Sequence, residues 1–94
     1  MNISKTKRFV KHRLQKKSPT VWIGKECLTD QSLIEIEKQL KKNKMLKIKI
    51  LKSALIQETK KEIAEKAAEK TGALLVDLIG SIFILYRRKD KEYE

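Results

Sequence analysis

The stretch TVWIGKECLTD, residues 20–30, carries the signal that decides the fold. Its first four residues form a short apolar run, which predicts a buried strand over Thr20–Ile23 rather than an edge strand. Gly24 ends the run, and Thr29 or Asp30 can cap the first turn of a helix. A strand that passes through a glycine turn into a helix predicts an α/β fold. The turn itself is either a binding site or only a connection.

Upstream of this stretch the sequence predicts a helix from Ile3 to Lys17. The segment lacks glycine and proline, and it has a narrow apolar stripe beside a broad basic face. Ser18-Pro19 ends the helix, because proline cannot continue it and restrains the residue before it. The stripe is formed by Ile3, Val10 and Leu14.

Downstream, MLKIKILK at residues 45–52 alternates as a strand does when one of its faces lies on a core, with Leu46, Ile48 and Ile50 on the apolar side. Gly72 is expected to close a helix, and Gly80-Ser81 to turn a hairpin. The remaining elements are a helix from the capping residue to about Lys42, which Asn43 is expected to close, a helix at 56–71 whose apolar side begins at Ile56, and strands at 73–79 and 82–88.

This order predicts a two-layer α/β domain with a four-stranded mixed sheet and three helices. Strands joined through helices run parallel with right-handed crossovers, and the final hairpin adds an antiparallel strand. We expect one domain over residues 1–94, with its core at about 5–88 and a charged tail at 89–94.

The charge is concentrated in the first quarter of the chain. The net charge is +11, and residues 1–25 hold eight lysines and arginines but no acidic residue. The other 69 residues hold fifteen basic and twelve acidic residues, so they are nearly balanced. A concentrated positive field of this kind favours a polyanionic partner, namely nucleic acid.

Cys27 is the only cysteine, which excludes an intramolecular disulfide and a cysteine-rich zinc site. No signal peptide is recognisable, and no apolar run approaches the ~20 residues that span a bilayer. We therefore expect a soluble, cytoplasmic, monomeric protein with no membrane partner, metal or cofactor.

The sequence does not favour an enzyme or a small-molecule substrate. His12 is the only histidine and lies on the basic helix, where no residue is predicted to orient it as a general base. Cys27 lies at a helix N-terminus, a position that lowers a thiol pKa, but no second cysteine or nearby histidine accompanies it. We interpret His12 as a surface residue and Cys27 as a small residue in a tight turn.

The candidate RNA-binding residues are basic or lie at the glycine turn, where backbone amides at the start of a helix favour phosphate. We expect the basic helix and the turn to converge on one side of the molecule. The residues are Lys7, Arg8, Lys11, Arg13, Lys16 and Lys17, then Gly24, Lys25 and Thr29, and finally Arg87 and Arg88. Two alternatives remain, a membrane surface and an adaptor role on an acidic protein surface that would use Trp22 as an anchor.

Three segments in order, PTVWIGKECLTD, LKIKI and TGALLVDLIGSIFILYRR, resemble the CRM (chloroplast RNA splicing and ribosome maturation) domain in its stand-alone YhbY-like form. The resemblance covers about residues 5–88. Its parts are Pro19, Ile23-Gly24-Lys25, Leu28-Thr29, Lys47 and Lys49, Gly72, Ile79-Gly80 and Leu85-Tyr86-Arg87.

The resemblance implies a fold similar to the C-terminal domain of translation initiation factor three. It also implies binding of structured RNA, most of all ribosomal RNA in ribosome assembly or on the ribosome, with intron or tRNA as other possibilities. Members of the family carry a GxxG loop likened to the KH-domain loop that clamps a nucleotide backbone. Here Gly24 opens that loop, but Cys27 stands at its last position. A cysteine would carry a steric cost there if the loop keeps a positive φ.

Overall fold

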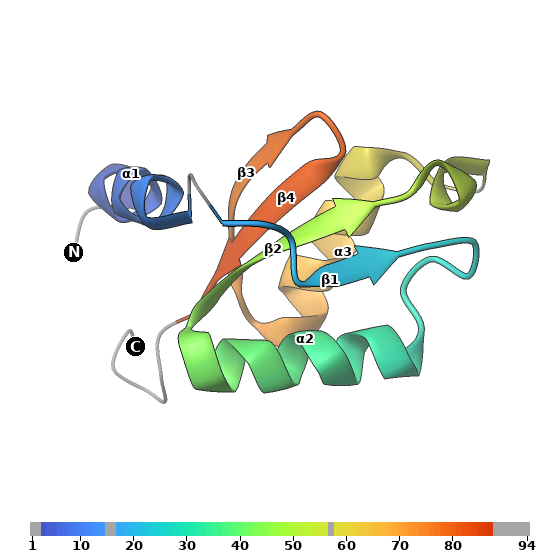
Figure 1. Ribbon diagram of the computed structural model, residues 1–94, viewed down its shortest axis with the longest axis horizontal. Helices are drawn as coiled ribbons and strands as arrows, with labels where there is room; N and C mark the ends of the chain where they lie inside the picture. Colours follow the sequence, from blue (N-terminus) through green and yellow to red (C-terminus); the bar gives the residue numbers. More distant parts are fainter. Residues whose placement is uncertain (1–2, 15–16, 57, 88–94) are drawn as a thin grey trace.

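The computed structural model describes residues 3–14, 17–56 and 58–87 (Figure 1). Along the chain the elements are α1 (Ile3–Leu14), β1 (Val21–Ile23), α2 (Asp30–Asn43), β2 (Met45–Ile50), the 3-10 helix η1 (Lys52–Ile56), α3 (Lys60–Thr71), β3 (Leu74–Ile79) and β4 (Ile82–Tyr86). Three α-helices and a four-stranded mixed sheet confirm the predicted fold class.

The strands lie in the order β1-β2-β4-β3. β1 and β2 are parallel, as predicted for strands joined through a helix, and β4 is antiparallel to both β2 and β3. The prediction of a buried first strand was wrong, because β1 pairs only with β2 and is therefore an edge strand. Val21 and Ile23 are buried on one of its faces, whereas Trp22 is exposed on the other.

The main core lies between the sheet and the helices α2 and α3. The alternation of β2 places Leu46, Ile48 and Ile50 in this core, as the sequence predicted. Phe83 comes from β4 and Ile63 from α3, and both are fully buried. These residues hold one face of the sheet against two helices.

Helix α1 packs on the opposite face of the sheet. Val10 and Leu14 are buried there against Val76 and Ile84, in a second and smaller apolar cluster. The side chain of Ile3, also predicted to belong to this stripe, lies outside the described residues. The predicted two-layer arrangement thus holds for α2, α3 and the sheet, and α1 adds a partial third layer at one end (Figure 1).

The helix ends follow their capping residues. Thr29 caps α2 by accepting the Ser32 backbone N–H at 3.0 Å. The predicted helix 56–71 begins later, because a capping box between Thr59 and Glu62 starts α3 at Lys60. Ile56 therefore lies outside α3, with 81% of its surface exposed, and does not belong to the core.

A residue in the left-handed backbone conformation follows the C-terminus of both α2 and α3. Gly72 has φ 66° and closes α3, as predicted. Asn43, predicted to close α2, is instead its last helical residue, and Lys44 takes the left-handed position with φ 68°. The hairpin turn at Gly80-Ser81 is also confirmed, since β3 and β4 pair on either side of it.

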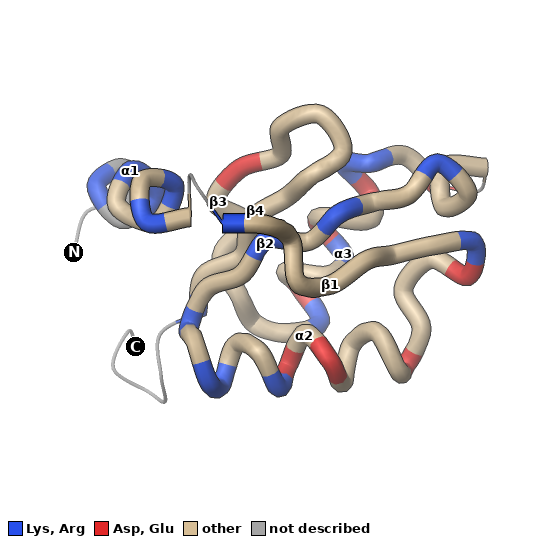
Figure 2. Tube along the Cα trace, viewed as in Figure 1, with Lys and Arg blue, Asp and Glu red and all other residues tan. Residues whose placement is uncertain are grey.

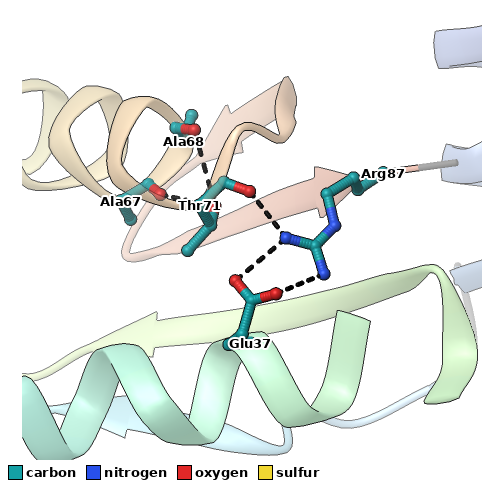
Figure 3. A network of polar contacts seen from close by, with 5 residues as sticks. All are labelled: Glu37, Ala67, Ala68, Thr71 and Arg87. Atoms are coloured by element: carbon teal, nitrogen blue, oxygen red, sulfur yellow. Dashed lines mark hydrogen bonds and ion pairs between the residues drawn. The ribbon is translucent and has the colours of Figure 1, made fainter. Parts of the chain in front are cut away.

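Arg87, the residue that follows β4, forms an ion pair and a hydrogen bond that link β4 to α2 and α3 (Figure 3). Arg87 donates from Nη1 to Glu37 Oε1 at 2.9 Å and from Nη2 to Glu37 Oε2 at 2.6 Å. Nη1 also donates to the carbonyl of Thr71, the last residue of α3, at 2.7 Å. The side chain of Arg87 is 15% exposed. This arginine therefore fixes α2 and α3 relative to the sheet.

We expect Arg87→Ala to lower the free energy of unfolding by about 1–2 kcal/mol, because Glu37 loses a bidentate partner while keeping some contact with water. The hydrogen bond from Arg87 lowers the pKa of Glu37 below its ordinary value of 4.5. The stabilisation is thus complete above about pH 4.5 and is lost as the pH falls through the lowered value. Urea unfolding of both proteins between pH 7 and 3 measures this. A difference that stays constant over that range would contradict the ion-pair explanation.

Candidate nucleic-acid interface

The cations of helix α1 lie beside its buried stripe and on its outer side. Arg8, Lys11 and Arg13 are exposed and Lys7 is half-buried. The Lys11 ammonium bonds Asp77 of β3 at 2.8 Å and lowers the pKa of that carboxyl. Within the described part of the chain, Lys7 and Arg8 have no ion pair.

These cations border a shallow hollow between α1 and β3 of about 390 Å³. Lys7, Arg8 and Lys11 line it on the helix side, and Val76 and Asp77 on the strand side. Arg13 lies nearby on the helix, with its guanidinium 5.7 Å from the centre of the Phe9 ring. The predicted basic helix therefore exists as an exposed cationic surface.

The turn after β1 keeps the backbone of a glycine loop even though its last residue is cysteine. Cys27 has φ 59°, and its N–H donates to the Gly24 carbonyl at 2.8 Å. The steric cost anticipated for cysteine is therefore present. The side chain is buried in the main core, where Sγ donates to the Ala54 carbonyl at 3.4 Å. Core packing thus holds Cys27 in a conformation that favours glycine.

The tip of this turn is exposed but carries mixed charge. Lys25 and Glu26 are neighbours at the tip, and Asp30 opens α2. Gly24 has no positive φ, and a Cβ built on it would lie 3.7 Å from Leu51, an ordinary contact. The fold therefore does not need glycine at position 24.

The expectation that the basic helix and the glycine turn converge was wrong. α1 lies at one end of a molecule that measures 37 Å along its longest axis, and the turn lies at the other end (Figures 1 and 2). The reason is β1 itself, since the chain must travel along this strand before it reaches Gly24. The two predicted contacts therefore lie at opposite ends of the molecule.

The sheet face between α1 and the turn is uncovered, and it carries two lysines that are not among the candidates predicted from the sequence. Lys47 and Lys49 alternate with the core residues of β2 and so point to the face that α1 only partly covers. The Lys47 ammonium donates to the Lys17 carbonyl at 2.9 Å, which brings Lys17 beside the same strand. The signal for this placement was the period of two in MLKIKILK.

The remaining candidates fall into three groups. Thr29 serves as the cap of α2, and its hydroxyl is occupied by Ser32. Arg87 binds Glu37 and Thr71, so its guanidinium is engaged within the fold. Lys16 and Arg88 lie outside the described residues.

The structure changes one expectation about catalysis, which concerns the pKa of the Cys27 thiol. Burial raises the pKa of the Cys27 thiol, and the neighbouring Glu58 adds to the shift, whereas a helix N-terminus alone would lower it. His12 is exposed. Among the described residues there is no group of three His, Cys, Asp or Glu side chains placed to hold a metal ion, and no helix is long and apolar enough to cross a membrane.

A family model of the CRS1 / YhbY (CRM) domain matches residues 3–87, nearly the whole chain. The chain belongs to this family. The CRM domain is also similar to a solution structure of a hypothetical protein from Staphylococcus aureus, with a TM-score of 0.77 and 29% identity over 98% of this chain and 96% of that one.

Three relatives carry RNA-binding names. This CRM domain is 36% identical over 86 residues to the Probable RNA-binding protein of Methanocaldococcus jannaschii, covering 92% of this chain but only 63% of that longer protein. It is 33% identical over 88 residues to an RNA-binding protein of Haemophilus influenzae, covering 94% of this chain and 87% of the relative. It is 26% identical over 96 residues to Probable RNA-binding protein YqeI of Bacillus subtilis, covering 98% of that relative.

We expect the Cys27 thiol to react slowly with a thiol reagent in the native protein and at least about tenfold faster in denaturant, because burial and a raised pKa both suppress the thiolate. The measurement is the rate of modification by a chromogenic disulfide with and without urea. Equal rates would show that the side chain does not lie in the core.

Proposed function

We propose that this CRM domain is an RNA-binding protein, not an enzyme, that binds structured ribosomal RNA during ribosome assembly or as a ribosome-associated component. The observation that carries the proposal is a track of cations that begins on α1 and continues with Lys47 and Lys49 on the uncovered face of β2. Figure 2 shows that basic positions recur along the chain from the end near α1 toward the turn after β1. The names of the relatives support RNA as the partner. Ribosomal RNA, as against an intron or tRNA, is inferred from the resemblance to the family alone.

The track suits a phosphate backbone because few acidic groups oppose it. Asp77 is the only acidic residue in the four strands, and Lys11 neutralises it. Lys25 adds a cation at the far end of the molecule, beside the acidic Glu26. Cations distributed over several elements let a folded RNA be recognised by its shape, with several phosphates held at once. The proposal places the protein in the cytoplasm, where a single cysteine stays reduced.

A second candidate is an adaptor that binds an acidic protein surface. It would need an exposed apolar anchor, and Trp22, 56% exposed, meets this requirement. The same cations would serve either partner, so the two candidates differ in how binding responds to salt and in what competes for the surface.

We expect the double change Arg8→Glu with Lys49→Glu to weaken RNA binding by at least about tenfold, because two positive points of the track become repulsive to phosphate. Arg13→Glu with Lys25→Glu should weaken it in the same direction. The matched control is Lys61→Glu with Lys70→Glu on the exposed side of α3, which changes the net charge equally. Gel-shift titration with a ribosomal RNA fragment measures the effect. Equal losses in track and control variants would mean that only net charge matters.

If about five phosphates are neutralised, the logarithm of the association constant should fall with the logarithm of salt concentration at a slope of about −3.5 to −4.5. Each single reversal within the track should reduce the slope by about one. Anisotropy titrations of labelled RNA between 50 and 300 mM salt measure this slope. Charges are screened increasingly over this range, since the Debye length is about 10 Å at 0.1 M salt. A flat response would favour the protein adaptor.

A further inference from the structure

Four residues form a row across the sheet on the face that α1 leaves open. The strand registers pair Trp22 with Lys49, Lys49 with Ile82, and Ile82 with Ile79. Paired residues on neighbouring strands point to the same face, and strands lie about 4.8 Å apart. The adjacent row, one residue along β2, is Val21, Ile48, Phe83 and Leu78, and it faces the main core. The first row must therefore face the other way.

This row is not covered by any described part of the chain. α1 covers the opposite end of the same face, over Met45, Leu74, Val76, Ile84 and Tyr86. By contrast, Trp22 is 56% and Ile79 59% exposed, and Lys49 is exposed between them. Single exposed apolar residues are common on protein surfaces, but here an indole and two isoleucines lie in one row, interrupted only by Lys49, whose methylene stem is itself apolar.

Positive charge lies in and beside the strip. Lys49 lies within the row next to Trp22, and Lys47 lies two residues earlier on the same face. The Lys17 carbonyl holds the Lys47 ammonium in place. Lys49 has no ion pair in the described part of the chain, and the nearest strand acid, Asp77, is taken by Lys11.

An exposed aromatic ring beside two lysines on an open sheet face has the chemistry that binds unpaired nucleotides. A base stacks on the ring, the ammonium groups hold neighbouring phosphates, and apolar neighbours exclude water. A double helix offers no free base face to the ring.

We propose that Trp22 is a stacking platform for one unpaired base of the RNA, with its flanking phosphates at Lys47 and Lys49. The inference rests on the proposed function, since it assumes that RNA is the partner. It adds that the RNA must present a single-stranded or bulged nucleotide next to Lys49, at the β1 edge of the sheet. Shape and charge then position the RNA, and Trp22 selects for an unpaired base.

The test uses the fact that Trp22 is the only tryptophan of the chain, so its fluorescence reports on this position alone. A labelled 12-nucleotide oligouridylate and a 12-base-pair RNA duplex are each titrated with the full chain, and label anisotropy and tryptophan fluorescence are recorded together. We expect the single strand to quench the fluorescence with the same midpoint as the anisotropy. We expect the duplex to bind without comparable quenching.

Variants separate stacking from folding. Trp22→Ala should weaken binding of the single strand about five- to hundredfold and leave duplex binding nearly unchanged, while Trp22→Phe should keep most of the affinity. The matched control is Ile34→Ala, which truncates an equally exposed apolar residue on α2. Urea unfolding confirms that each variant folds.

Two results would overturn the inference in different ways. RNA binding by anisotropy, with unchanged fluorescence and unchanged affinity of Trp22→Ala, would overturn the stacking platform and leave the proposed function standing. Absence of binding to either RNA and to a ribosomal RNA fragment would overturn both.

Discussion

Strand β2 determines both the main core of the molecule and the cationic open face of its sheet. It pairs with β1 on one side and β4 on the other, and its strict alternation sends three apolar residues into the core and two lysines to the opposite face. The burial that stabilises the fold and the positive charge of the open sheet face are thus set by the same six residues. A shift of one residue in its register would exchange the two faces and lose both properties.

The sequence predicted those parts of the fold that depend on local pattern. The alternation around Ile48, the cap at Gly72 and the turn at Gly80 each have a local physical cause, and the structure confirms all three. The edge position of β1 was missed, because a three-residue apolar run looks the same whether one or two of its edges are paired. Ile56 was misplaced because helical spacing extended past the capping box at Thr59.

The exposure of the candidate cations was predicted better than their arrangement in space. Charge clustering identified the cations of α1, and Arg8, Lys11 and Arg13 are exposed in the structure. Charge clustering says nothing about distance in space, so the separation of α1 from Gly24 followed only from the path of β1. Arg87 looked like another cation in the sequence, but a basic residue that will pair with Glu37, fifty positions away, cannot be recognised from its own neighbours.

The cysteine at position 27 has a consequence for how the turn moves. In a GxxG loop that ends in glycine, the last residue has no side chain that could anchor the loop in the core. Here the Cys27 side chain is buried in the core and donates a hydrogen bond to the carbonyl of Ala54 in η1, so the turn cannot shift without disturbing packed residues. It is consequently preorganised, and a partner that docks on it loses little conformational entropy in ordering it. The turn is therefore a rigid part of the molecular surface that does not need to rearrange when a partner binds.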